Sequence, residues 1–372
     1  MSQSAAPQIL VGIPDLVIGE VDGPEVYSFG AIGGLEIEPS GRIFVADFLI
    51  GSVLVYSTQG EFLFRIGRSG DGPREYKFYP CNISILRDGF LWIVSDGDGF
   101  LRVDPRRPDL PATLERIDLP RGGPPIHCEP VGLDDESALV AGAPLFDRDA
   151  GLTLRRVRLD VETGQLLGET LVERPSLDEM GWRRIEPRGN ARRIGEAELW
   201  ERYAPPPYGN DYLEAWAPDG RFATGVTARY RINIYDVAAR LQRVIERDVS
   251  GPPLTAEERR RTSELMDRRR REAHPDLPYP YPEVPRHKTP LRKMWFDRDG
   301  RLWLERYLED PTNQAADVYG LDGELLFEAE WPVGISLELG AIRRSTGLGV
   351  RKDDLGVSRV VRLRFTPKQL RS

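Results

Sequence analysis

Short apolar runs separated by glycine turns recur along this chain with a nearly constant spacing. An apolar run at 30–37 ends at a turn with Gly41, and a second run follows at 43–46. The same order of run, turn and run returns around Gly89, 48 positions after Gly41. Runs of roughly four to eight apolar residues bounded by such turns are typical of β-strands. A repeat of about 50 residues is the length of a propeller blade or a solenoid unit.

The first repeat divides into short apolar segments joined by tight turns. These segments span 30–37, 42–47, 52–56 and 61–66. Their order predicts a meander of antiparallel strands. The segment 43–46 is apolar at every position rather than at every second one, which is typical of a strand covered on both faces. We therefore expect the sheet to lie between two others.

Turns of the same kind divide the rest of the chain into further copies. The expected units are 29–67, 78–120, 126–173, 210–249, 289–331 and 335–366. The last unit has three strands, whereas the apolar segment 14–20 precedes the first unit and has no place in it. If Leu16 to Gly19 pair with 360–365, the ring closes and no blade keeps a bare edge. The sequence thus predicts an all-β, six-bladed β-propeller whose N-terminal strand closes the last blade.

Two segments interrupt the repeat within a single domain expected at 8–366. They are 177–208, between the third and fourth units, and 251–288, between the fourth and fifth. The second contains the capping box Thr255 to Glu258, which predicts a helix that runs to about Ala273. Both insertions join an outer strand to the next inner strand, so we expect them on one face, over one mouth of the central channel. Insertions on a repeat scaffold commonly mark its binding face.

The second repeat resembles the NHL repeat of six-bladed propellers. The resemblance rests on Ile66-Gly67, Asp71-Gly72-Pro73, Phe78 and Pro80, then on the turn Asp88-Gly89 and the strand at 91–94. It covers 18–100 and again 289–331. The resemblance implies the propeller fold, and many bacterial propellers of this kind are exported proteins of uncharacterised role. It does not imply one chemistry, because enzymes and binding platforms share the scaffold.

Charge and hydropathy argue against two classes of partner. The net charge of -8 and the pI near 5.3 differ from the strongly basic balance of a nucleic-acid binder. Arginines are frequent in 255–274, but acidic residues alternate with them at helical spacing, which favours a solvated helix. No apolar run approaches the roughly 18 residues of a membrane-spanning helix. We expect a monomer that binds a small molecule or a protein, with no nucleic acid and no membrane span.

The compartment depends on features that the sequence leaves open. Residues 1–8 contain no charged segment followed by an apolar one, so no export signal is present in the sequence as given. We expect a periplasmic or secreted protein if such a signal was trimmed, and a cytoplasmic one otherwise. Cys81 and Cys128 begin neighbouring inner strands. They either form a bridge, which would favour an oxidising compartment, or remain buried thiols.

The first strand of each propeller blade lines the channel, and we expect the start of that strand to face the insertions. Candidate ligand-binding residues at these positions are Asn82, Glu129, Asp211, Tyr212, Arg292 and Arg343. Such a ring suits an anionic or zwitterionic ligand, because Arg presents a planar fork to carboxylate or phosphate. Apolar walls are expected from Trp182, Tyr208, Tyr279 and Tyr281. The prediction is a non-catalytic binding protein without a cofactor. The plainer alternative is that the charged residues pair with one another.

A metal-dependent hydrolase or lyase is the rival hypothesis. Gluconolactonase-like propellers, which this chain resembles in blade number, hold calcium with Glu, Asn and Asp. The matching residue types here are Asn82, Glu129, Asn210 and Asp211, but Gly33-Gly34 stands where that family has Glu-Gly-Pro. Amidating-lyase propellers hold zinc with three histidines. This chain has His127, His274 and His287, of which His127 and His287 precede inner strands and could form a pair.

Overall fold

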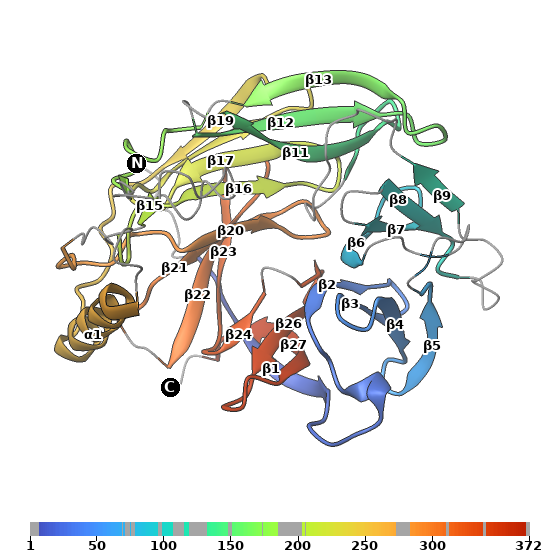
Figure 1. The fold of residues 1–372 in the computed structure, drawn as a ribbon, viewed down its shortest axis with the longest axis horizontal. Coiled ribbons are helices and arrows are strands. Elements are labelled where there is room, and N and C mark those ends of the chain that lie inside the picture. Colours follow the sequence, from blue (N-terminus) through green and yellow to red (C-terminus); the bar gives the residue numbers. More distant parts are fainter. Residues whose placement is uncertain are drawn as a thin grey trace.

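The computed structural model of the protein consists of β-sheets arranged as the blades of a propeller (Figure 1). It describes residues 7–68, 70, 75, 79–95, 99–106, 115–118, 132–147, 151–172, 174–184, 203–204, 206–272, 283–309, 312–337 and 340–369. The sheets follow one another around a ring in chain order, and the first blade lies next to the last. The predicted six-bladed β-propeller is therefore confirmed.

The strands of each blade are consecutive in the chain and pair in order. Blade 1 contains β2 (Ile32–Ile37), β3 (Ile43–Asp47), β4 (Ser52–Tyr56) and β5 (Phe62–Ile66). Blade 2 contains β6 (Pro80–Ile85), β7 (Leu91–Ser95), β8 (Gly99–Val103) and β9 (Glu115–Asp118). Blade 3 contains β10 (Gly132–Leu133), β11 (Leu139–Asp147), β12 (Gly151–Leu159) and β13 (Leu166–Val172).

The second half of the ring follows the same plan. Blade 4 contains β16 (Tyr212–Trp216), β17 (Phe222–Val226), β18 (Arg231–Tyr235) and β19 (Leu241–Glu246). Blade 5 contains β20 (Lys293–Phe296), β21 (Leu302–Arg306), β22 (Asn313–Tyr319) and β23 (Leu325–Pro332). Blade 6 contains β24 (Ile335–Ser336), β25 (Ile342–Arg343), β26 (Thr346–Lys352), β27 (Ser358–Pro367) and, from the other end of the chain, β1 (Ile9–Ile18).

Strand β1 closes the ring as predicted. It runs antiparallel to β27, with Leu16 opposite Arg362 and Ile18 opposite Val360. The carboxylate of Asp15 accepts hydrogen bonds from Arg362 Nε at 2.7 Å and Arg364 Nε at 2.9 Å. The first residues of β1 also pair in parallel with β23, Ile9 lying opposite Glu328. This second pairing, which the sequence pattern does not show, joins blades 5 and 6 into one sheet.

Strand β3 shows why the blades need neighbours on both sides. All five of its residues are buried. Phe44 and Ala46 pack against blade 2, whereas Ile43 and Val45 pack against blade 6. Burial of one large aliphatic or aromatic side chain contributes roughly 1.5–3 kcal/mol. The predicted strand covered on both faces is therefore present, and its two faces stabilise two different interfaces.

An apolar cluster fills the space between each pair of neighbouring blades. Representative pairs, in order around the ring from blades 1 and 2 to blades 6 and 1, are Phe44 with Ile93, Trp92 with Val157, Val140 with Trp216, Ile232 with Leu304, Trp303 with Leu363, and Val360 with Leu54. Within the described residues, the cluster between blades 3 and 4 is the smallest. That interface relies more on polar side chains than the others do.

A buried ion pair ties blades together across the ring. Arg298, in the turn that follows β20, places Nε 2.7 Å from Oε2 of Glu36 in β2. Its Nη2 donates to the carbonyl of Ile83 in β6 at 3.1 Å, and its backbone N–H donates to the carbonyl of Ile342 in β25 at 2.9 Å. Glu36 is fully buried and also accepts the N–H of Ile85 at 2.8 Å. One arginine of blade 5 thus contacts blades 6, 1 and 2.

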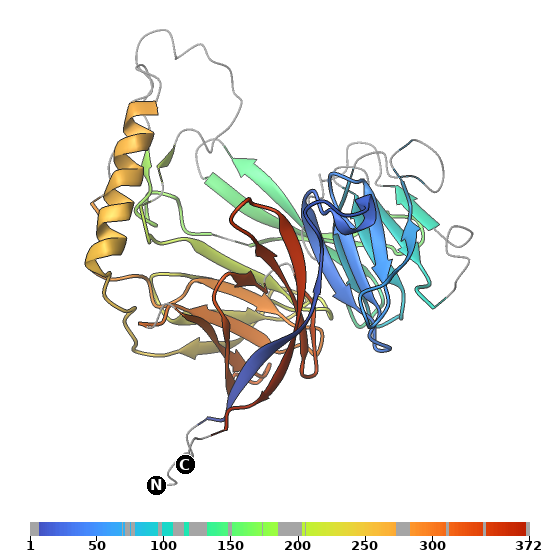
Figure 2. The same ribbon diagram turned by 90° about the horizontal axis from the view of Figure 1, so that it is seen from below.

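The segments between blades contain the remaining elements. Helix α1 (Ala256–Glu272) lies between β19 and β20, and its capping box forms as predicted, with Glu258 N–H donating to Thr255 Oγ1 at 3.1 Å. Figures 1 and 2 show α1 at the edge of the molecule. The short strands β14 (Arg183–Arg184) and β15 (Tyr203–Ala204) pair between blades 3 and 4, and the 3₁₀ helix η1 (Glu25–Tyr27) precedes β2. None of the described helices combines the length and apolar character needed to cross a bilayer.

One of the two cysteines can be placed. Cys81, near the start of β6, is disulfide-bonded. The other cysteine of the chain, Cys128, lies outside the described residues. Of the two states that the sequence left open for Cys81, the structure has the bridged one.

We expect Arg298→Met to lower the free energy of unfolding by about 3–5 kcal/mol, because it leaves the carboxylate of Glu36 buried without its cation. Urea denaturation followed by tryptophan fluorescence measures this change. The double variant Arg298→Met with Glu36→Gln should lose less stability than Arg298→Met alone, since no uncompensated charge stays buried. Equal stability of the single variant and the parent protein would show that the pair does not hold the blades together.

Candidate functional site

The structure places most of the predicted ligand-binding residues, but not all of them. Glu129, Tyr279 and Tyr281 lie outside the described residues, as do His127 and His274. Among the placed residues, Trp182, Tyr208, Asp211 and Tyr212 come together with Asn210 around the start of β16. Arg292, which precedes β20, lies next to this group, because its guanidinium and the Tyr208 ring both contact Tyr307. Asn82 and Arg343 lie elsewhere on the ring.

The segment 206–212 is held by its own backbone and by neighbouring side chains. Trp182 Nε1 donates to the carbonyl of Asn210 at 3.0 Å, and Asn210 Oδ1 accepts the N–H of Ala228 at 3.2 Å. Thr227 Oγ1 accepts a hydrogen bond from the N–H of Asp211 at 2.8 Å. These bonds hold Asn210 and Asp211 in place directly before Tyr212. On the same segment, the Tyr208 ring packs edge-on against Tyr307 of blade 5 at 6.0 Å.

A groove of about 590 Å³ lies beside the start of β16, on the side of blade 4 that faces blade 3. Its lining residues are Arg174, Pro175, Glu179, Asn210, Tyr212, Thr224, Gly225, Val226, Arg229, Arg231, Asn233 and Tyr235. Side chains alternate between the two faces of a strand, so Tyr212, Glu214 and Trp216 of β16 share this face. The groove therefore has tyrosine walls and an arginine-rich rim.

Arg174 is held firmly over one wall of the groove. Its guanidinium carbon lies 4.5 Å from the centre of the Tyr212 ring, so the two side chains form a cation–π interaction. Its Nη2 also donates to Oε2 of Glu214 in an ion pair, while Trp216 Nε1 donates to Oε1 of the same carboxylate at 2.6 Å. The Nε–H of Arg174 is buried and has no hydrogen-bond acceptor among the described residues. Arg174 thus has a fixed position.

The other charged side chains on the groove are Arg231, Glu179 and Arg229, and they differ in their partners. Arg231 is paired with Glu246 at 2.9 Å. Glu179 instead accepts the backbone N–H of Ser176 at 2.7 Å, and this bond lowers the pKa of Glu179. Arg229 is exposed, and neither a hydrogen bond nor an ion pair of its side chain is found in the described part of the chain. Arg229 is therefore the cation best placed to meet an anion.

The groove lies where the apolar contact between blades is weakest. The described cluster between blades 3 and 4 contains only Val140, Val172, Trp216 and Phe222 as buried members. The first strand of blade 3, β10, has two residues, whereas the other blades begin with longer inner strands or, in blade 6, with two short ones. Polar side chains take the place that apolar ones occupy at the other interfaces.

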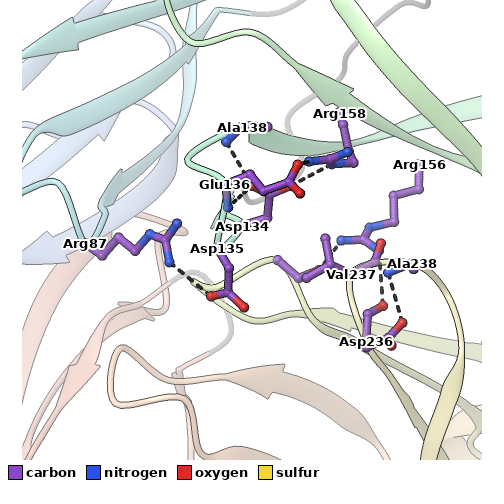
Figure 3. A network of polar contacts seen from close by, with 11 residues as sticks. Arg87, Asp134, Asp135, Glu136, Ala138, Arg156, Arg158, Asp236, Val237 and Ala238 are labelled. Atoms are coloured by element: carbon purple, nitrogen blue, oxygen red, sulfur yellow. Dashed lines mark hydrogen bonds and ion pairs between the residues drawn. The ribbon is translucent and has the colours of Figure 1, made fainter.

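Arg156 of β12 crosses the same interface and reaches the turn of blade 4 that contains Asp236 and Val237 (Figure 3). Its guanidinium lies over the rings of Trp216 and Phe222 at 5.4 and 4.9 Å. It donates to the carbonyls of Gly220, Val237 and Asp236, the last at 3.3 Å. Burial lowers the pKa of Arg156 to about 10, against the opposing effect of the surrounding acidic groups. Figure 3 shows that Arg158, two residues along, points instead to Asp134 and Glu136.

Arg292 and Arg343 do not lie at the same end of the blades, contrary to the prediction that both face the insertions. Arg292 precedes β20, where Nη1 pairs with Glu305 at 2.7 Å and the guanidinium lies 5.6 Å from the Tyr307 ring centre. Arg343 is the last residue of β25. Consecutive antiparallel strands reverse direction, so the end of an inner strand lies opposite its start. The placement of Arg343 among the residues facing the insertions was therefore wrong.

The predicted metal-ligand residues are dispersed in the described part of the chain. Asn82 lies in β6, beside Gly34 of the neighbouring blade. His287 forms an isolated backbone bridge with Pro253. Asn210 and Asp211 are adjacent, and partial burial raises the pKa of Asp211. No group of three His, Cys, Asp or Glu side chains close enough for a metal occurs among the described residues.

Comparisons with known proteins agree with this architecture. A family described as "6-bladed beta-propeller" matches residues 24–96. A candidate exported protein of Bacteroides fragilis matches with a TM-score of 0.50 at 11% identity, over 99% of this chain and 98% of the other. A DUF4221 family member from Bacteroides vulgatus has a TM-score of 0.49 at 9% identity, over 98% and 100%. The calcium-binding protein regucalcin of Agrobacterium tumefaciens has a TM-score of 0.40 at 13% identity, over 98% of each chain.

No curated protein matches the sequence. At these identities the solved structures show the fold alone. Function has to be argued from the residues of the site, because propellers share their architecture across unrelated activities.

We expect Arg156→Leu to lower the free energy of unfolding by about 2–4 kcal/mol, because three carbonyls lose their donor in a largely buried interface. Thermal and urea denaturation measure the loss. The matched control is Arg240→Leu, since Arg240 pairs with Asp236 in the same turn but is 78% exposed. A surface pair of that kind contributes at most about 1 kcal/mol. If both variants lost the same stability, Arg156 would not be a clamp between blades 3 and 4.

Proposed function

We propose that this propeller is a non-catalytic binding protein that holds a small anionic molecule in the groove between blades 3 and 4. The observation that carries the proposal is the exposed Arg229 on the rim of a groove whose wall is the Arg174 and Tyr212 pair. Ligand sites in proteins combine apolar or aromatic walls with a few polar groups that converge on the ligand. The groove has the aromatic wall and the converging polar groups, and polar residues form most of its lining.

The chemistry of the lining residues favours an anion with a planar part. A guanidinium group offers paired N–H donors that match carboxylate or phosphate oxygens. Tyr212 and Tyr235 present ring surface against which a flat molecule can pack. Asn210, Thr224 and Asn233 add neutral polar groups that can orient it. A small aromatic acid or phosphate ester fits this combination better than a cation or a neutral sugar.

In the groove the anchoring charge is Arg229, whereas the sequence pattern predicted Arg292 or Arg343 in the channel. Arg292 is a weaker anchor because its guanidinium is already paired with the buried carboxylate of Glu305. Trp182 and Tyr208 keep a supporting role, since they hold and flank the segment that carries Tyr212. A protein partner is the other class of ligand that the sequence left open.

Two further properties belong to the same proposal. The blades are of the NHL type, as the repeat around Gly67 and Asp88 suggests. The protein functions outside the cytoplasm, because the disulfide at Cys81 requires an oxidising compartment to persist. The likeness to a candidate exported protein of Bacteroides fragilis supports this location.

Titration calorimetry with benzoate and phenyl phosphate tests the groove. We expect both anions to bind and neutral benzamide not to bind. Arg229→Ala should weaken binding about tenfold, the loss expected for one charge-assisted contact, without a change in melting temperature. Arg243→Ala, which removes an exposed arginine from the outer strand of the same blade, is the control. Unchanged affinity in Arg229→Ala, or no binding of either anion, would refute the proposed site.

Metal analysis tests the rival hypothesis of a calcium- or zinc-dependent hydrolase or lyase. We expect protein purified without chelator to contain far less than one equivalent of either metal, because the described ligand-type residues are dispersed. Elemental analysis by mass spectrometry measures the content. About one equivalent of tightly held metal, together with a lactonase, esterase or lyase activity that chelation abolishes, would favour the enzyme over the binding protein.

A further inference from the structure

A second pocket lies at the opposite end of the blades from the groove. It has a volume of about 480 Å³ and lies among turns of blades 1, 5 and 6. Its lining residues are Ile37, Glu38, Pro39, Ser40, Gly41, Thr58, Asp299, Arg343, Arg344, Ser345, Thr346, Arg362 and Arg364. We call it the arginine basin. It contains Arg343, which the sequence pattern marked as an anchoring charge but placed at the other end.

The arginines of the basin outnumber the acidic groups that can neutralise them. Arg362 and Arg364 share the single carboxylate of Asp15. Burial works to raise the pKa of Asp15, but the hydrogen bonds from both arginines hold it below its ordinary value, so this carboxylate stays ionised. Arg343 and Arg344 have no ion pair in the described part of the chain. The basin is thus a positive region on a chain whose net charge is -8.

The acidic residues on the basin wall are already engaged with other partners. Glu38 pairs with Arg42 at 2.7 Å and accepts the hydroxyl of Ser40 at 2.6 Å. Asp299 pairs with Arg301 at 2.9 Å and accepts the backbone N–H of Arg344. Neither carboxylate is within ion-pair distance of the guanidinium groups of Arg343 and Arg344. The free positive charge of the basin is therefore open to a ligand.

The backbone of Arg344 gives an independent reason to expect a ligand. The turn between the first and second strands requires positive φ, and blades 1, 2, 4 and 5 supply glycine there, for example Gly41 at 94° and Gly300 at 79°. The corresponding turn has Ser137 at 65° in blade 3 and Arg344 at 54° in blade 6. Left-handed backbone costs free energy for any residue with a Cβ, and such strain concentrates at functional sites. An arginine here has a cost that the fold does not require.

The strained turn is also held rigidly. Asp299 accepts the N–H of Arg344, and Arg301 Nη2 donates to its carbonyl at 2.9 Å. Arg301 is in turn fixed by the buried Asp297 at 2.6 Å, which also accepts Nε1 of Trp303 at 2.8 Å. A chain of contacts from the core of blade 5 thus positions the backbone of Arg344. Such support is what a preorganised binding site needs.

We propose that the arginine basin binds a small polyanion through its carboxylate or phosphoryl oxygens. Arg343 and Arg344 supply the unpaired guanidinium groups, and Arg362 and Arg364 add positive charge at the outer wall. The planar fork of arginine matches both kinds of oxyanion. The basin lacks the tyrosine walls of the groove, so a compact, highly charged molecule fits it better than an aromatic acid. This second site does not depend on the function proposed for the groove.

Titration calorimetry with citrate and with pyrophosphate, at low ionic strength, tests the proposal on the full chain. We expect at least one of the two to bind, and affinity to fall as salt is added. Binding of citrate alone would assign carboxylate ligands, and binding of pyrophosphate alone would assign phosphoryl ligands. Failure of both to bind would overturn the proposal.

Arg344→Gly separates binding from folding, because glycine suits the backbone of this turn. The variant should melt no lower than the parent protein, yet bind the probe about tenfold more weakly. Arg343→Gln should weaken binding similarly. Arg359→Gln is the control, since Arg359 lies on β27 outside the basin and pairs with Asp353. Arg229→Ala, in the groove, should leave citrate and pyrophosphate binding unchanged. Full affinity in Arg344→Gly, or a loss confined to Arg229→Ala, would place the anion elsewhere and refute the basin.

Discussion

Each blade of this molecule packs apolar side chains against both of its neighbours, so no blade can be stable without a neighbour on each side. Strand β3 is the clearest case, because alternate residues of one buried strand pack against blade 2 and blade 6. A linear stack of such sheets would leave two apolar faces in water. The ring removes both, and strand β1 from the N-terminal end completes the last blade. The bond of Asp15 to two arginines of β27 and the pair of Arg298 with Glu36 reinforce this closure.

The interfaces of the ring are not equivalent, and their differences determine where ligands can bind. Between blades 4 and 5, the buried Asp317 pairs with Arg247 at 2.6 Å and Arg306 at 2.7 Å, so its charge is fully compensated. Between blades 3 and 4 the described apolar cluster is small. There Arg156 of blade 3 donates hydrogen bonds to backbone carbonyls of blade 4, such as that of Gly220. Above Arg156 the two sheets leave a groove with Arg229 unpaired on its rim.

The ring also separates two groups of arginines on an acidic molecule. The groove lies at the starts of inner strands, and the arginine basin lies at their ends. In a meander these two sets of residues alternate along the chain, so arginines that are close in sequence can belong to opposite faces. Two anions could therefore bind at the same time without contact between them. The negative charge of the rest of the surface would limit binding to these places, since it repels anions elsewhere.

The local pattern of the sequence was sufficient to establish the fold, because blade architecture depends on features that neighbours in the chain determine. Glycine turns near Gly41 and Gly89, apolar runs such as 43–46, and the spare segment 14–20 predict blades, their order and the closing strand. The capping box at Thr255 predicts the start of α1 for the same reason. The parallel pairing of β1 with β23 has no such signal, since it depends on where the closing strand ends in space.

The candidate sites depended on contacts between blades, which the sequence records only indirectly. The residues around the start of β16, including Tyr212 and Asp211, were found because inner strands can be recognised by their position in the repeat. Arg174 and Arg229 were missed. Arg174 follows the outer strand of blade 3 and Arg229 lies in a turn of blade 4, so only the packing of the two blades brings them to one groove. Arg343 was assigned to the wrong face, since its blade begins with two short strands rather than one. The sequence by itself determined the blades and their closure, whereas only the tertiary structure decided which charges stay unpaired, because pairing depends on distances between segments far apart in the chain.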